Sequence, residues 1–131
     1  MTVVDTHVLV WWVSDGARLS ATARRAIRRA SRQTPVVAST ITLFEIATAV
    51  RRGRLQLGQP LDEWITDLRV LPELRFEPVT AEIAYSAGSL DDSFPGDPAD
   101  RIIVATARTL RASLVSADQR LRRSPVANVV W

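Results

Sequence analysis

Residues 94–107, Phe94-Pro95-Gly96-Asp97-Pro98-Ala99-Asp100-Arg101-Ile102-Ile103-Val104-Ala105-Thr106-Ala107, open with helix-start signals and continue as an apolar run. Asp97 stands where an N-cap residue belongs, and Pro98 follows at the first helical position, where its missing N–H costs nothing. Asp100 falls in the first turn, where the helix dipole favours negative charge. Because the second half is apolar except for Thr106, the helix is predicted to be buried. Two carboxylates are therefore expected where a buried helix begins, at the edge of a core.

Three further acidic residues stand out beside predicted strands and helices. Thr2–Val4 is a β-branched run that predicts a strand ending at Asp5, and Ala112–Ser116 predicts a later strand with Asp118 just beyond it. Glu45 lies on a predicted helix whose other residues are nearly all apolar. Each has a simpler explanation when taken alone, such as a helix cap or a glutamate that reaches solvent.

The rest of the chain alternates between predicted helices and strands. Helices are expected over His7–Val13, Ala21–Gln33, from Ser39 or Thr40 to Arg51, Leu61–Leu71 and Thr80 to about Leu90, and strands over Val36–Ala38, Phe76–Val79 and, as an edge strand, Val126–Trp131. This alternation predicts an α/β fold, a three-layer α/β/α sandwich with a mostly parallel central sheet. A length of 131 residues favours a single domain over residues 1–131.

The four acidic positions are expected to meet at one edge of that sheet. In parallel sheets, ligands bind beyond the carboxyl ends of the strands, where Asp5 and Asp118 stand. Glu45 lies on the helix after the second strand and Asp100 at the start of a helix, so both can reach the same rim. Four carboxylates without basic partners repel one another, and a divalent cation relieves that repulsion. Oxygen ligands favour Mg²⁺ or Mn²⁺ over zinc, and such an ion suits activation of a water against a phosphodiester.

Composition removes several other kinds of chemistry. The chain has no cysteine, so disulfides, thiolate metal sites and a cysteine nucleophile are excluded. His7 is the only histidine, which rules out a histidine pair; we expect it to pack beside Trp11, with catalysis as the lesser alternative. No apolar run has membrane-spanning length and no signal pattern is visible, which favours the cytoplasm.

All 17 basic residues are arginine, and the net charge is +3. Five of them form one broad face of the helix predicted from Ala21: Arg24, Arg25, Arg28, Arg29 and Arg32. This face has two explanations of about equal weight, a solvated surface and a surface that contacts nucleic acid.

Four segments resemble the successive motifs of PIN-domain nucleases, most closely the VapC-type toxins of bacterial toxin–antitoxin systems. They are Val4-Asp5-Thr6-His7, Phe44-Glu45-Ile46, Gly96-Asp97-Pro98-Ala99-Asp100-Arg101 and Val115-Ser116-Ala117-Asp118, and together they cover essentially the whole chain. The resemblance implies a Mg²⁺- or Mn²⁺-dependent endoribonuclease, a homodimer, and a cognate antitoxin that holds it inactive. Phe94-Pro95 departs from the histidine-containing approach to the third motif in many relatives.

By the matching motifs, Asp5, Glu45, Asp100 and Asp118 would form the catalytic and metal-binding quartet. Asp5 and Asp100 would be the principal ligands, Asp97 a secondary one, and Ser116 a supporting hydroxyl. The apolar residues of Leu61–Leu71 have two explanations, core or partner surface. Those of Val8–Val13 and Leu61–Leu71, tryptophans among them, that do not fit the core are expected to provide surfaces for a second copy and for the antitoxin.

Two other functions are alternatives to a nuclease. Receiver-like phosphoacceptor domains are also parallel α/β folds with an acidic pocket, but they resemble one another in using a lysine beside the phosphorylated aspartate, and this chain has no lysine. A non-catalytic RNA-binding module would use the arginine-rich surfaces but would leave the four acidic residues unexplained.

Overall fold

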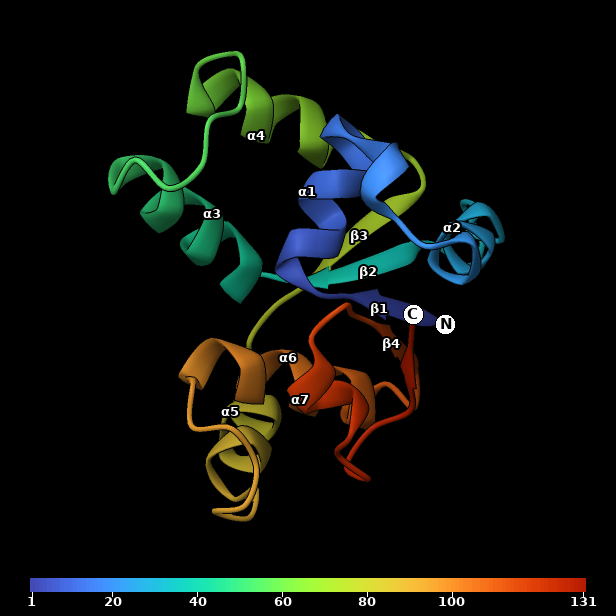
Figure 1. Cartoon of the computed structure of the whole chain (residues 1–131), viewed down its shortest axis with the longest axis vertical. Coiled ribbons are helices and arrows are strands. Elements are labelled where there is room, and N and C mark those ends of the chain that lie inside the picture. The colour runs from blue at the N-terminus through green and yellow to red at the C-terminus, as the bar shows by residue number, and fades with distance from the viewer.

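Five parallel strands form the centre of the computed structural model, which describes residues 1–131 (Figure 1). The strands are β1 (Thr2–Val4), β2 (Val36–Ser39), β3 (Leu74–Glu77), β4 (Ser113–Val115) and β5 (Val129–Val130), in the order β3-β2-β1-β4-β5. The predicted α/β fold is confirmed, and the sheet is parallel throughout rather than mostly parallel.

Helices cover both faces of the sheet. They are α1 (Thr6–Ser14), α2 (Ala21–Arg28), α3 (Ile41–Arg51), α4 (Leu61–Arg69), α5 (Ala81–Gly88), α6 (Pro98–Thr109) and α7 (Gln119–Arg122), with a 3₁₀ turn, η1, at Gly16–Arg18. Helices α1–α4 pack on one face and α6 and α7 on the other, with α5 outside α6 (Figure 1). Successive strand residues point to opposite faces, so Val4 and Val115 join the first core while Val3 and Leu114 join the second.

The strand order places a crevice at the carboxyl ends of β1 and β4. From β1 the chain moves outward through β2 and β3, and then returns to the other side of β1 to form β4 and β5. Connections leave β1 and β4 in opposite directions at this switch point, which opens space for a ligand. Asp5 directly follows β1, and Ser116 directly follows β4.

Several predicted boundaries were wrong for local reasons. The helix expected over Ala21–Gln33 ends at Arg28 because the Ser31 hydroxyl accepts a hydrogen bond from the Thr34 amide, which forms a turn instead. The strand expected over Phe76–Val79 lies at Leu74–Glu77, since Pro78 has no N–H to continue the ladder. The edge strand is only Val129–Val130, paired with Leu114 and Val115 of the short β4.

The apolar residues of α1 and α4 pack largely into the core. Val8, Leu9, Trp64 and Leu68 are buried, and the other tryptophans are half-buried against the same core. The large apolar side chains that remain exposed are Met1, Val13, Phe44, Val70 and Tyr85, with Phe44 66% and Tyr85 80% exposed. No helix has both the length and the apolar character needed to cross a membrane.

Candidate active site

All five predicted carboxylates line one hollow at the carboxyl end of the sheet. The hollow has a volume of about 420 Å³, and its polar lining consists of Asp5, Thr6, His7, Glu45, Arg54, Asp97, Asp100, Asp118 and Arg120. The four acids of the quartet come from the ends of β1 and β4, the middle of α3 and the first turn of α6. Chain topology therefore brings together positions that are far apart in the sequence.

Asp5 is held rigidly at the floor of this site. It is the N-cap of α1, where its Oδ1 accepts a hydrogen bond from the Thr6 amide at 2.8 Å. The hydroxyl of the buried Ser116 donates to Asp5 Oδ2 at 2.7 Å and accepts from the Asp118 amide at 3.0 Å. Asp5 is only 4% exposed, so these bonds fix the carboxylate and couple the ends of β1 and β4.

Glu45 faces the site rather than solvent. The Thr6 hydroxyl donates to its carboxylate and also lies 3.0 Å from the hydroxyl of the buried Thr42. Sequence reasoning did not single out Thr6 or Thr42, although Thr6 directly follows the strand-end aspartate. Burial raises the pKa of Glu45, the Thr6 hydrogen bond opposes that rise, and the charges of Asp5 and Asp97 add to it.

Asp97 and Asp100 play different parts at the start of α6, as the helix-start pattern predicted. Asp97 Oδ1 accepts hydrogen bonds from the amides of Ala99 at 2.9 Å and Asp100 at 3.2 Å, so Asp97 is the N-cap. The Asp100 side chain lines the hollow and is 15% exposed. Arg101 turns away from the site and donates to the carbonyl oxygens of Ala87 and Leu90, which ties the start of α6 to α5 and the loop beyond it.

Arg120 is the basic partner that the sequence analysis did not expect for the acidic residues. Its guanidinium donates to both oxygens of Asp118, at 3.3 and 2.9 Å, and lies 3.4 Å from Asp100 Oδ2. Asp118 is the N-cap of α7, a short helix absent from the prediction, and this helix aims Arg120 back at the site. The Arg120 hydrogen bond is the main cause that lowers the pKa of Asp118.

The surroundings of Asp100 disfavour the charged form of its carboxyl group. Burial raises its pKa to about 7, and the charges of Asp5, Asp97, Glu45 and Asp118 all add to the rise. The nearby Arg120 does not cancel this effect, because its contact with Asp100 is long and the arginine side chain is 63% exposed to solvent. Near neutral pH, Asp100 is therefore divided between its charged and neutral forms.

His7 has the packing role predicted for it. Its ring meets the Trp11 ring edge-on, with centroids 4.9 Å apart. Nε2 accepts a hydrogen bond from the Ala117 amide at 3.0 Å, which leaves the proton on Nδ1, 3.6 Å from Asp5 Oδ2.

The donor chemistry of the hollow suits a hard divalent cation. Every acidic group offers oxygen, and the shared charge that raises the pKa of Asp100 is relieved by a bound cation. The side chains as they stand do not form a closed cage, since no three His, Cys, Asp or Glu residues are grouped to hold an ion. Arg120 pairs with Asp118 and Asp100, so this arginine competes with a cation for the oxygens of these two residues.

Replacing Asp97 separates capping from charge. Asp97→Ala is expected to lower the free energy of unfolding by about 0.5–2 kcal/mol because two amides lose their acceptor, and to reduce activity only partly. Asp97→Asn keeps a capping oxygen and should melt close to the wild type. Thermal melts in EDTA measure the loss of stability, and an assay of the endoribonuclease activity that the motifs imply measures the loss of activity. An inactive Asp97→Asn with an unchanged melting temperature would instead assign Asp97 to the reaction.

Comparison with known proteins agrees with the fold and with the family that the motifs resemble. The PIN domain family model matches residues 2–126. Ribonuclease VapC22 of Mycobacterium tuberculosis is 38% identical over 131 residues, covering 98% of this chain and 97% of that protein. VapBC2 from Rickettsia felis, solved bound to a DNA fragment from its promoter, aligns with TM-score 0.71 at 16% identity over 98% of this chain and 96% of that one. M. tuberculosis VapC20, described as a Sarcin-Ricin loop cleaving toxin, aligns with TM-score 0.66 at 19% identity over 98% of this chain and 99% of that one.

Proposed function

The chain belongs to the PIN-domain family of VapC-type ribonucleases, and on that premise we propose that it cleaves RNA with a divalent cation held by Asp5, Glu45, Asp100 and Asp118. The observation that carries the proposal is the gathering of these carboxylates in one hollow, where their mutual repulsion contributes to raising the pKa of Asp100 to about 7. In this proposal, residues 1–131 form one nuclease domain that acts in the cytoplasm as the toxin of a toxin–antitoxin pair.

The residues of the site have distinct tasks. Asp5 and Asp100 are the principal ligands, Glu45 and Asp118 complete the set, and Asp97 contributes charge from the rim. Ser116 holds the Asp5 carboxylate in one orientation, and Thr6 does the same for Glu45. A bound Mg²⁺ or Mn²⁺ supplies charge neutralisation and a water activated for attack on the phosphodiester. The protein's contribution is to hold the carboxylates in place before the substrate arrives.

Metal removal tests this function directly. The purified chain is expected to cleave RNA with Mg²⁺ or Mn²⁺, to stop when EDTA is added and to recover when the metal is restored in excess. Gel analysis of a labelled RNA follows all three steps on one sample. Cleavage that survives thorough chelation would refute the proposed chemistry, and metal-independent RNA binding without cleavage would favour an RNA-binding module.

Arg120 is expected to compete with the cation for the site. Arg120→Gln frees the oxygens of Asp118 and Asp100, so Mn²⁺ should bind more tightly, by roughly a few-fold because the arginine is exposed to solvent. Titration calorimetry with Mn²⁺ measures the change. Arg122→Gln is the matched control, since Arg122 has the same charge and lies on the same helix but pairs with no acid. Equal Mn²⁺ affinity in both variants would show that Arg120 does not obstruct the site.

We also propose a cognate antitoxin and a homodimer. A toxin–antitoxin complex from Klebsiella pneumoniae has the same fold, with TM-score 0.67 at 22% identity over 100% of this chain and 97% of that one, which supports an antitoxin partner. A hollow of about 370 Å³ between α1 and α4 offers a place for an antitoxin segment, and its lining mixes five apolar residues (Val13, Leu57, Trp64, Leu68 and Leu71) with Ser14, Gln59 and Asp67. The exposed Phe44 and Tyr85 support self-association. Light scattering that gives a strict monomer at high concentration would refute the dimer.

A further inference from the structure

We propose that the RNA strand leaves the acidic hollow along a track of aromatic and arginine side chains that ends in a basic hollow between α2 and the sheet. The aromatic–arginine track consists of Trp11, Trp131, Arg18, Arg25 and Arg29. This proposal rests on the proposed function, because it takes RNA as the ligand. It adds a substrate-binding surface distinct from the carboxylates and gives a role to Arg25 of α2 and to Arg29, the C-cap of that helix.

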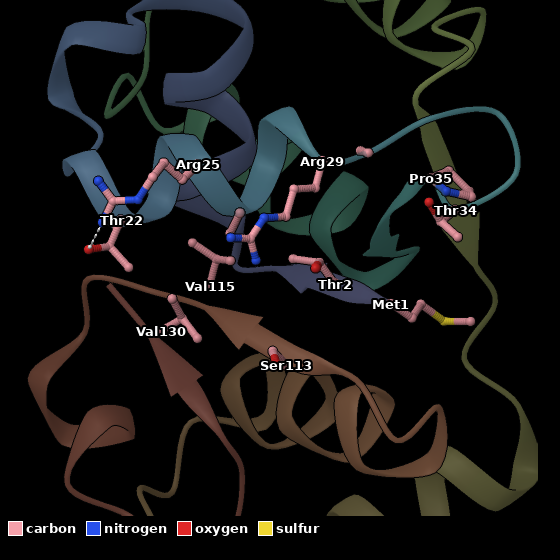
Figure 2. Close-up of a pocket in the computed structure, with 12 residues that line it drawn as sticks. Met1, Thr2, Thr22, Arg25, Arg29, Thr34, Pro35, Ser113, Val115 and Val130 are labelled. Atoms are coloured by element: carbon pink, nitrogen blue, oxygen red, sulfur yellow. Dashed lines mark hydrogen bonds between the residues drawn. The ribbon is translucent and has the colours of Figure 1, made fainter.

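The far end of the track is a cavity with a volume of about 540 Å³ (Figure 2). Its polar lining is formed by Thr2, Thr22, Arg25, Arg29, Thr34 and Ser113, and it contains no acidic residue. Figure 2 shows the Arg29 side chain reaching into the hollow towards β1 and β4 rather than away from the protein. The lining thus combines two positive charges with several hydroxyl groups.

The two arginines of this hollow have no ionic partner. Arg25 donates one hydrogen bond, to the Thr22 hydroxyl at 3.2 Å, and Arg29 makes no side-chain hydrogen bond. Neither forms a salt bridge; the arginines that do so are Arg75 and Arg120. A planar guanidinium matches the paired oxygens of a phosphate, so this hollow is suited to a backbone phosphate of RNA.

Aromatic rings connect the basic hollow to the acidic one. His7 and Trp11 line the acidic hollow, and the Trp11 ring lies 5.8 Å from the Trp131 ring, centroid to centroid. Trp131 directly follows Val130, which lines the basic hollow. Arg18 lies over the Trp11 ring at 4.6 Å, which puts a positive charge on the connection.

This arrangement is the one that proteins use for single-stranded nucleic acids. Bases stack on aromatic rings while arginines follow the phosphates, and the binding tolerates different sequences. Trp11 and Trp131 are half-buried, so part of each residue is accessible from outside, and Trp131 does not have the arginine that lies over the Trp11 ring. From Thr2 at the basic hollow to Asp5 at the acidic one, β1 spans roughly 10 Å. The track therefore engages nucleotides close to the scissile bond on one side.

Binding of single-stranded RNA in EDTA tests the track without relying on cleavage. The probe is a fluorescent 20-nucleotide RNA, and anisotropy is measured at several salt concentrations. The double variant Arg25→Gln/Arg29→Gln is expected to bind at least 10-fold more weakly and to lower the slope of log K against log salt by about 1.4, since each lost phosphate contact removes about 0.7. The matched control is Arg69→Gln/Arg108→Gln, which removes the same charge from exposed arginines on α4 and α6. Its RNA affinity and its salt slope should both change much less than those of the Arg25→Gln/Arg29→Gln variant.

A second pair of variants tests the aromatic part. Trp131→Ala should weaken RNA binding by roughly 5- to 150-fold, the range expected for loss of one stacked base, and Trp131→Phe should restore most of it. Thermal melts show whether each variant remains folded. If Trp131→Ala is unfolded, the RNA affinity of Trp131→Phe is compared with that of the wild type instead. Equal RNA affinity in the folded tryptophan variants would exclude stacking on this ring.

The outcomes separate this proposal from the nuclease function. If the wild type binds RNA with a salt slope that depends on Arg25 and Arg29 but does not cleave with metal, the track stands and the proposed function fails. If the wild type cleaves RNA while the Arg25/Arg29 variant binds RNA as the control does, the track is overturned. Poly-glutamate serves as a second probe, for an acidic protein segment. If the Arg25→Gln/Arg29→Gln variant loses poly-glutamate binding while its RNA binding is unchanged, the RNA track is overturned and the hollow is assigned to an acidic protein segment.

Discussion

Asp100→Asn is expected to abolish RNA cleavage while leaving the metal-free protein as stable as the wild type or more stable at pH 7 and above. The substitution keeps the shape of the side chain but removes a charge that burial and four other carboxylates disfavour. Activity should fall by at least 100-fold, because the variant loses a principal cation ligand. The opposite signs of the two effects distinguish a carboxylate kept for chemistry from one kept for stability.

The prediction for Asp100→Asn can also be tested through the pH dependence of the free energy of unfolding. The pKa of Asp100 is about 7 in the folded protein and 3.8 as an ordinary carboxyl group, so between these values the folded state holds a proton that the unfolded state has released. The Asp100 contribution therefore destabilises the protein progressively as pH rises from about 4 to 7, and stays constant above that. In Asp100→Asn this contribution to the pH dependence is absent, although the smaller one from Glu45 remains.

Thermal melts in EDTA between pH 4.5 and 8, paired with cleavage assays in Mn²⁺, measure both effects. Glu82→Gln is the matched control, since Glu82 is also in the first turn of a helix but lies outside the acidic hollow. It should retain activity and the pH dependence of the wild type. An Asp100→Asn protein that melts well below the wild type and still cleaves RNA would make Asp100 a helix-terminal residue only.

Asp5→Ala is expected to lose both activity and stability. The alanine removes the acceptor of the Thr6 amide and leaves the buried Ser116 hydroxyl without its acceptor, and together these losses cost about 1–3 kcal/mol of unfolding free energy. Cleavage should fall by at least 100-fold because a second principal ligand is gone. The two changes have separate causes, so a second substitution can divide them.

Asp5→Asn makes that division. Asparagine is as good an N-cap as aspartate, so it should recover most of the stability that alanine loses. It should recover little activity, since an amide is a poorer ligand for a hard cation than a carboxylate. Urea unfolding in EDTA gives the stabilities, and cleavage in Mn²⁺ gives the activities. Restored cleavage in the asparagine variant would mean that Asp5 acts by positioning and not as a ligand.

The parts of the site that could be predicted from sequence were those with local signals. The Asp97-Pro98 pair and Asp100 were expected at the start of α6 because an N-cap followed by proline depends only on neighbouring residues. Asp5 and Asp118 were expected at one rim because both follow strands of a parallel sheet. In each case the chain itself fixes the position, and little depends on side-chain packing.

The parts that were missed depend on contacts between distant residues. Arg120 was only one of several arginines after β4, and nothing near it in sequence indicates its contact with Asp100, 20 residues away. The Thr6–Glu45 contact joins residues 39 apart. The burial of the tryptophans of α1 and α4 could not be predicted, because periodicity identifies an apolar face but does not say how much of it a neighbouring element covers.

The strand order determines when the active site can assemble during translation. β1 pairs with β2 after fewer than 40 residues, but its other neighbour, β4, begins only at Ser113. The carboxylates at positions 5, 45 and 100 therefore lack Asp118 and the Ser116 hydroxyl that orients Asp5 until the segment after Ser113 has been translated. A nascent chain that has not reached these residues has no assembled site. A nuclease of this topology is therefore unable to cleave the surrounding RNA while residues 1–112 are being synthesised.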